Sequence, residues 1–120
     1  MNSKKIWFIP AGMVALGIFL LSTFLSIPIQ VEGVGYLDKL EHCFAYFVLI
    51  ISFMIAFRKA DILTPKRAIN LLLIASGYGF GLEVVQYTFF SYRYFEWIDA
   101  LANVLGVLIG FGVFKLFDRG

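Results

Sequence analysis

The stretch Gly77-Tyr-Gly-Phe-Gly-Leu-Glu-Val-Val-Gln86 places one carboxylate, Glu83, deep within a segment that is otherwise apolar enough to lie in lipid. Ionisable side chains within membrane-spanning segments are costly, and they usually face a protein interior or a wet cavity. The three glycines before Glu83 remove side chains from this helix, which lets a neighbouring backbone approach closely. The stretch therefore predicts a membrane helix that packs against other helices and carries a functional acid.

The composition is that of an integral membrane protein. Of the 120 residues, 61% are hydrophobic and 15% are charged, whereas soluble globular domains are about one-quarter charged. This length holds about four helices of about 20 residues, so we expect a single domain over residues 1–120. The apolar residues form continuous runs rather than alternating, which disfavours a β-barrel. The net charge of +2 is small and the basic residues flank apolar runs, so no nucleic-acid partner is expected.

Four membrane spans are predicted, over about residues 6–27, 38–57, 68–90 and 98–117. A cleaved signal peptide is the alternative for the first span, but its apolar run exceeds the usual length of about 7–15 residues and no Ala-x-Ala site follows. The uncharged run 43–57 is too short to cross a bilayer, so the second helix must begin near Asp38. Thr64-Pro65 is a start signal for the third helix.

The basic residues predict the orientation of this all-α, four-helix transmembrane bundle. With four spans, both termini and the connection 58–67 lie on one side of the membrane, and the other side carries only Lys39 and Arg93. The first side carries eight of the ten Lys and Arg residues: Lys4, Lys5, Arg58, Lys59, Lys66, Arg67, Lys115 and Arg119. Because basic residues accumulate in cytoplasmic segments, we expect both termini to be cytoplasmic.

Polar residues from three spans are predicted to meet near the opposite, external face of the membrane. Positions four apart share a helix face, which aligns Asp38, His42 and Tyr46 in the second span. Asp99 and Asn103 are aligned in the same way in the last span. The full set expected at compatible depth is Asp38, His42, Glu83, Gln86, Arg93, Asp99 and Asn103.

These residues also have structural explanations. Asp38 and Asp99 lie at helix N-termini, where a carboxylate caps the helix and interacts favourably with its dipole. Gln86 and Asn103 could link helices by hydrogen bonds. Glu83 has the weakest structural explanation, because it lies too deep for its short side chain to reach water easily.

Three short motifs follow one another along the second, third and fourth spans. They are Asp38-Lys-x-x-His42-x-x-x-Tyr46, Glu83-x-x-Gln86 and Asp99-x-x-Ala102-Asn103-x-x-Gly106-x-x-x-Gly110. In this order they resemble the VanZ-like family of small bacterial membrane proteins, and Arg93 matches an arginine often found before the third motif. The resemblance implies a multi-pass protein of the bacterial cytoplasmic membrane. Its name-giving members are linked to low-level resistance to the glycopeptide teicoplanin, but the family implies no settled biochemical activity.

The first function class that fits is an enzyme or binding site for an amphiphilic envelope molecule, such as a lipid-linked intermediate or a phospholipid headgroup. Glu83 and His42, the latter oriented by Asp38, could exchange protons with such a substrate. The catalytic candidates are His42, Glu83, Asp38 and Asp99. The candidates for substrate binding are Arg93, which could hold a phosphate through two hydrogen bonds, and Gln86, Asn103 and Tyr46. The same acids and His42 could hold a divalent cation, but nothing fixes a ligand geometry, so metal and cofactor stay open.

The second class is non-enzymatic. The chain would be a small proton- or cation-coupled transporter, with Glu83 as the coupling site, or a modulator of an envelope enzyme. Four short helices enclose little volume, so transport would require self-association. The face formed by Gly106 and Gly110 is the candidate surface for such a homo-oligomer. We prefer the first class, because polar residues confined to one membrane face suit a pocket better than a path across the bilayer.

Overall fold

The regular structure that the computed structural model describes is entirely helical. The described residues are 5–24, 35–89 and 97–118, without the side chains of residues 21–24, 35–39, 86, 87, 89, 97 and 99. The elements are a 3-10 turn, η1 (Lys5–Trp7), and four α-helices: α1 (Phe8–Phe24), α2 (Gly35–Lys59), α3 (Pro65–Phe89) and α4 (Trp97–Phe117). The predicted all-α, four-helix fold is confirmed.

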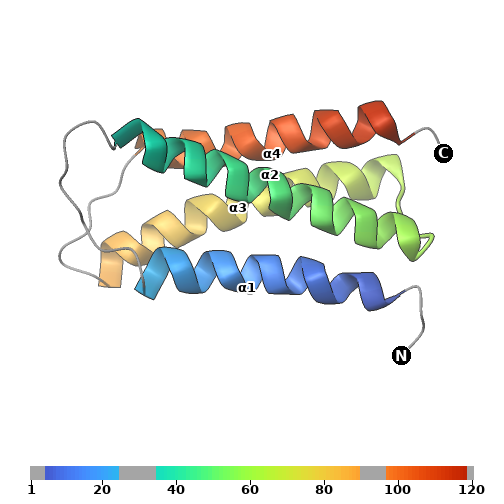
Figure 1. Cartoon of the computed structure of the whole chain (residues 1–120), viewed down its shortest axis with the longest axis horizontal. Helices are drawn as coiled ribbons and strands as arrows, with labels where there is room; N and C mark the ends of the chain where they lie inside the picture. Colours follow the sequence, from blue (N-terminus) through green and yellow to red (C-terminus); the bar gives the residue numbers. More distant parts are fainter. Residues whose placement is uncertain (1–4, 25–34, 90–96, 119–120) are drawn as a thin grey trace.

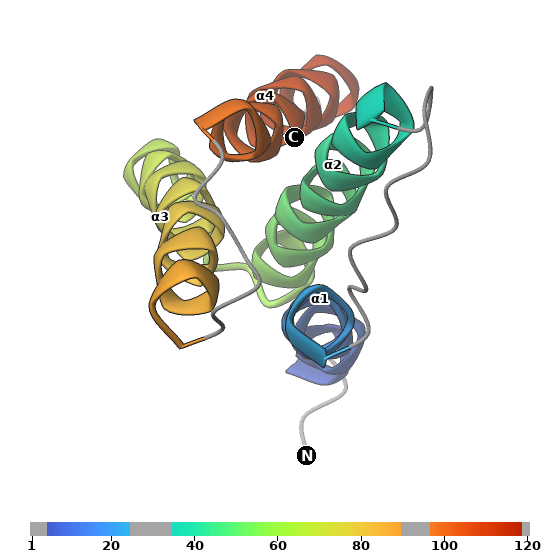
Figure 2. The same ribbon diagram turned by 90° about the vertical axis from the view of Figure 1, so that its left-hand side faces the viewer.

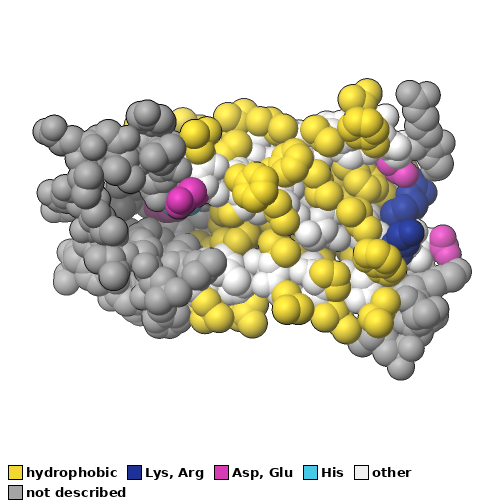
Figure 3. All heavy atoms as spheres, in the orientation of Figure 1, with side chains coloured by type: hydrophobic (Ala, Val, Ile, Leu, Met, Phe, Trp, Pro, Cys, Tyr) yellow, Lys and Arg dark blue, Asp and Glu magenta, His cyan; other side chains and the backbone are white. Residues whose placement is uncertain are grey.

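The four helices run alternately in opposite directions along the long axis of the molecule (Figure 1). The start of α1, the α2–α3 turn and the end of α4 therefore lie together at one end, which we call the terminal end. The starts of α2 and α4 and the end of α3 form the far end. Lys and Arg side chains gather at the terminal end (Figure 3). They lie there because the basic segments are at the start of α1, at the α2–α3 turn and at the end of α4, which the alternating helix directions bring to one end. Which end faces the cytoplasm stays a prediction.

The outer surface suits a membrane. Three helical stretches are long and apolar enough to cross one, namely Leu40–Lys59, Pro65–Val85 and Ala100–Phe117, and a shorter apolar stretch, Lys5–Leu20, lies beside them. A hydrophobic band covers the middle of the visible face (Figure 3). The chain is therefore a membrane protein, while the crossing of the bilayer by α1 stays a prediction.

The helix ends at the α2–α3 turn follow from their sequence. The Oγ1 of Thr64 accepts a hydrogen bond of 3.1 Å from the backbone N–H of Arg67, which caps α3 and sets its start at Pro65, as Thr64-Pro65 predicted. Helix α2 ends in a Schellman motif, in which the N–H of Ile62 donates to Phe57 O at 3.0 Å. Asp61 holds the left-handed position of this motif with a φ of 61°.

Helix α2 is the centre of the bundle. It packs against α1, α3 and α4, as the view along the bundle shows (Figure 2). Its closest contact is with α4, where Gly106 lies against the backbone of Cys43 and Gly110 lies against Phe47 and Ile50. The two glycines thus serve packing within the chain, and self-association through them stays a prediction. The contact fixes the depth of α4 relative to α2.

Candidate functional site

Helices α2, α3 and α4 converge on Gly79. A Cβ atom added to Gly79 would lie 3.0 Å from the Tyr46 ring, 3.0 Å from Asn103 Cβ and 3.1 Å from Asn103 Nδ2. The absence of a side chain at Gly79 therefore allows a phenol from α2 and a carboxamide from α4 to meet against the backbone of α3. We call Tyr46, Glu83 and Asn103 the polar cluster.

Glu83 follows Gly79 by four positions, so it lies on the same face of α3, one turn nearer the far end. Glu83 is only 3% exposed. The prediction that this acid faces the protein interior rather than lipid is confirmed by its burial. A buried carboxyl at this depth needs polar neighbours, because an isolated charge in hydrocarbon is costly.

Asn103 is 2% exposed and has an unsatisfied acceptor. Its Oδ1 makes no hydrogen bond with any part of the chain that the structure describes. Most buried polar groups in native proteins are hydrogen-bonded, and a buried acceptor without a partner costs about 1–3 kcal/mol. Among the described residues, the carboxamide of Asn103 therefore has an acceptor that no donor satisfies.

Tyr78 borders the polar cluster, and sequence reasoning did not single it out. Its ring centroid lies 6.3 Å from that of Tyr46, and its hydroxyl donates a hydrogen bond of 2.6 Å to Ala15 O. This bond links α3 to α1, which no sequence motif includes. The only sequence signal was the position of Tyr78 next to Gly79 in the glycine-rich stretch.

The polar cluster lies near the far end. Six positions separate Glu83 from the end of α3 and six separate Asn103 from the start of α4, which is about 9 Å at about 1.5 Å per residue. His42 precedes Tyr46 by one turn and is partly buried, level with Glu83 because α2 and α3 are antiparallel. The structure thus brings together four of the predicted site residues at a similar depth.

The remaining candidates cannot be placed as side chains. Asp38, Gln86 and Asp99 lie in α2, α3 and α4, but their side chains are outside the described residues, and Arg93 lies wholly outside them. Within the described ranges, no three His, Cys, Asp or Glu residues form a group that could hold a metal ion.

The expectation about the three glycines needs a correction. Only Gly79 meets another helix, whereas a Cβ at Gly77 or Gly81 would have no neighbour within 4 Å. The reason is geometric, since residues two apart on an α-helix point in nearly opposite directions at 3.6 residues per turn.

Comparison with known proteins places the chain in a family. The family model described as VanZ/LLP1 matches residues 3–118. The chain is also 38% identical over 71 residues to a protein of Schizosaccharomyces pombe described as uncharacterized protein C11E3.10, a match that covers 58% of this chain and 41% of that protein. The match thus spans less than half the length of this relative. No solved structure matches the chain. A family match over almost the entire length, on a helical membrane fold, shows that the chain belongs to the VanZ/LLP1 family.

Proposed function

We propose that the chain binds the headgroup of a membrane phospholipid in the polar cluster, either as an enzyme or as a binding protein. One observation carries the proposal: Asn103 Oδ1 is buried without a hydrogen-bond partner in the described structure, and Asn103 packs against Gly79, one helical turn from the buried Glu83. Helix packing alone would favour satisfied groups at this site, because burying an unpaired acceptor destabilises the fold. A ligand with hydrogen-bond donors would complete the cluster.

The chemistry of the three side chains suits a polar headgroup. Tyr46 carries a hydroxyl that can donate, Asn103 both donates and accepts, and Glu83 accepts when ionised. Hydroxyl or ammonium hydrogens of a headgroup match the acceptors, and Arg93 is the sequence candidate for the phosphate. Glu83 and His42 could also move protons, which leaves room for acid–base chemistry on the bound lipid.

A phospholipid is favoured over a cell-wall precursor. Because a relative comes from a yeast, the proposed ligand should be of a class that both bacterial and eukaryotic membranes contain. The basic residues at the terminal end support cytoplasmic termini, so the polar cluster would serve the outer leaflet of a bacterial cytoplasmic membrane. A link to teicoplanin resistance would then be an indirect effect on the envelope.

A proton- or cation-coupled transporter has less support. The polar cluster lies near one end, and the cavity next to it, towards the middle of the bundle, has apolar walls formed by α1, α2 and α3. An ion that passed Glu83 would enter this apolar region, where it would lose its hydration without compensation. A headgroup site needs no such path.

The proposal can be tested by ligand-induced stabilisation of the purified chain in detergent. The probes are short-chain phosphatidylethanolamine, phosphatidylglycerol and phosphatidylcholine, and the readout is the thermal unfolding midpoint. A ligand at about 100 times its Kd stabilises the native state by about 2.7 kcal/mol. We expect at least one headgroup to raise the midpoint of the wild type, and Asn103→Leu and Glu83→Gln to reduce this rise severalfold.

Matched controls use exposed residues of the same types. Asn70→Leu on α3 and Glu41→Gln on α2 change exposed side chains outside the polar cluster and should retain the full rise. The proposal fails if no headgroup stabilises the wild type, or if the Asn103 and Glu83 variants respond as their controls do.

A further inference from the structure

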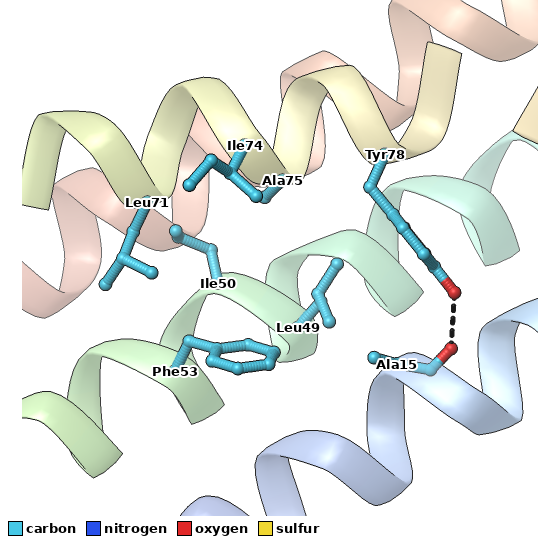
Figure 4. A pocket seen from close by; sticks show the side chains of 8 residues that line it. All are labelled: Ala15, Leu49, Ile50, Phe53, Leu71, Ile74, Ala75 and Tyr78. Atoms are coloured by element: carbon cyan, nitrogen blue, oxygen red, sulfur yellow. Dashed lines mark hydrogen bonds between the residues drawn. The ribbon is translucent and has the colours of Figure 1, made fainter. Parts of the chain in front are cut away.

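A cavity of about 130 Å³ lies between α1, α2 and α3 (Figure 4). Its lining residues are Ala15 of α1, Leu49, Ile50 and Phe53 of α2, and Leu71, Ile74, Ala75 and Tyr78 of α3. The walls are apolar, so water gains no hydrogen bonds inside. An engineered cavity of about 150 Å³ with similar Leu, Ile and Phe walls stays dry and binds benzene. The cavity therefore suits a short segment of hydrocarbon.

The cavity is accessible from the side of the bundle. Helices α1 and α3 contact each other only over a short stretch, whereas α1 packs more extensively against α2. Ile74 lines the cavity and is also 67% exposed, so it lies at the mouth. Because Ile74 belongs to Pro65–Val85, a stretch suited to crossing the bilayer, the medium outside this mouth is acyl chains rather than water.

Tyr78 connects the cavity with the polar cluster. Its side chain forms one wall of the cavity and reaches α1 through the hydrogen bond to Ala15 O (Figure 4). The ring of Tyr78 also lies near that of Tyr46 in the polar cluster, with 6.3 Å between the ring centroids. Leu49, a second wall residue, follows Tyr46 by less than one turn of α2. A polar site near the far end and an apolar cavity towards the middle of the bundle thus lie next to each other. A membrane lipid likewise carries its headgroup at the membrane surface and its acyl chains towards the middle of the bilayer.

We propose that the cavity holds a segment of one acyl chain of the lipid whose headgroup occupies the polar cluster, an inference that rests on the proposed function. The chain segment leaves one apolar medium for another, so it gains packing contacts rather than hydrophobic free energy. The cavity then selects a chain by its shape and width, while the polar cluster selects the headgroup. The ligand class is a membrane lipid with at least one slender acyl chain.

Photo-crosslinking from within the acyl chain tests this inference. The whole protein is reconstituted in phosphatidylcholine vesicles that contain a small fraction of a phospholipid with a diazirine midway along one acyl chain. After illumination, mass spectrometry maps the modified residues. We expect adducts on the inner wall residues Ala15, Leu49 and Phe53 at severalfold higher yield than on the exposed lipid-facing residues Leu101 and Leu108.

A pair of adjacent surface variants provides the control. Ile74→Trp places a large ring at the mouth and should reduce the adducts on the inner wall severalfold. Leu73→Trp changes a neighbour that is 60% exposed and does not line the cavity, so it should leave them unchanged. Both positions face outward, so both variants are expected to fold, which the elution profile of the purified protein checks. Equal labelling of wall and exposed residues, or an equal effect of the two variants, would overturn the inference.

The outcomes separate this inference from the proposed function. If a headgroup stabilises the wild type but the wall residues are not preferentially labelled, the acyl-chain site is wrong and the headgroup site stands. The opposite outcome is that diazirine phospholipids with different headgroups label the wall residues equally, with Glu83→Gln changing neither this labelling nor the rise in the unfolding midpoint. In that case the cavity still binds acyl chains and the headgroup proposal is wrong.

Discussion

Replacement of Gly106 by alanine tests the contact between α2 and α4, on which the position of Asn103 depends. The added Cβ would overlap the carbonyl oxygen of Cys43 and would lie 2.9 Å from its carbonyl carbon and 3.0 Å from its Cα. These neighbours are backbone atoms of α2, so they cannot move aside by changing a rotamer. The two helices must separate to accept the methyl group.

The magnitude follows from two opposing effects. Overpacking of a close contact costs about 1–3 kcal/mol, and the upper end applies because the clash is with backbone. Alanine is favoured over glycine within a helix by about 1 kcal/mol. We therefore expect Gly106→Ala to lower the free energy of unfolding by about 2 kcal/mol. Gly112→Ala on the same helix meets no atom within 4 Å and should raise it by up to about 1 kcal/mol.

The assay is reversible unfolding in mixed micelles by increasing mole fraction of sodium dodecyl sulfate, followed by far-ultraviolet circular dichroism. The two variants should differ by about 3 kcal/mol, with the wild type between them. If Gly106→Ala is as stable as Gly112→Ala, helices α2 and α4 do not approach as closely as described, and the convergence at Gly79 loses its basis.

Three further predictions concern orientation, the α2–α3 turn and the polar cluster. Reporter enzymes active only in the periplasm should be inactive when fused to either terminus; activity at both would reverse the orientation, and activity at one would contradict the four spans. Asp61→Val should lower the free energy of unfolding by about 1–2 kcal/mol, because a β-branched residue is strained at a φ near 61°; an unchanged or higher value would contradict this. Gly79→Ala should remove the phospholipid-induced rise in the unfolding midpoint, since its methyl group would displace Tyr46 and Asn103. Gly81→Ala, which has no neighbour within 4 Å, should retain it.

The sequence predicted the number of helices and the compatible depth of Glu83 and Asn103 in α3 and α4, while their role in a site stays a prediction. The long uncharged runs predicted the number of helices, because a span requires about 20 apolar residues. The cost of burying an acid indicated that Glu83 faces other helices, and the four-residue spacing of Asp99 and Asn103 placed both on one face of the last span. Helix ends were less accurate where polar residues extend a helix beyond its apolar run, as at Gly35, where α2 begins before Asp38.

The partners of each helix were harder to predict. An apolar membrane helix such as α1 has little hydrophobic asymmetry, because lipid and protein interior are similarly apolar, so its sequence does not reveal which face packs. The cavity beside Tyr78 and the bond to Ala15 were missed for this reason. Likewise, Gly106 and Gly110 indicated a close helix contact but not that the partner is α2. The side chains of Asp38, Gln86 and Asp99, and all of Arg93, stay predictions.

The close pairing of α2 with α4 has a consequence for biosynthesis. The ribosome makes α4 after α2 and α3, so a nascent chain that has inserted α2 and α3 still lacks the helix on which α2 packs most closely. During that interval Asn103 does not yet pack against Gly79, one turn before Glu83 on α3, and the carboxyl group of Glu83 is held in the bilayer by an incomplete set of helices. Insertion and assembly are therefore separate events for this protein. Chains truncated before residue 103 should be degraded quickly by membrane proteases, even though α2 and α3 are long and apolar enough to cross the bilayer.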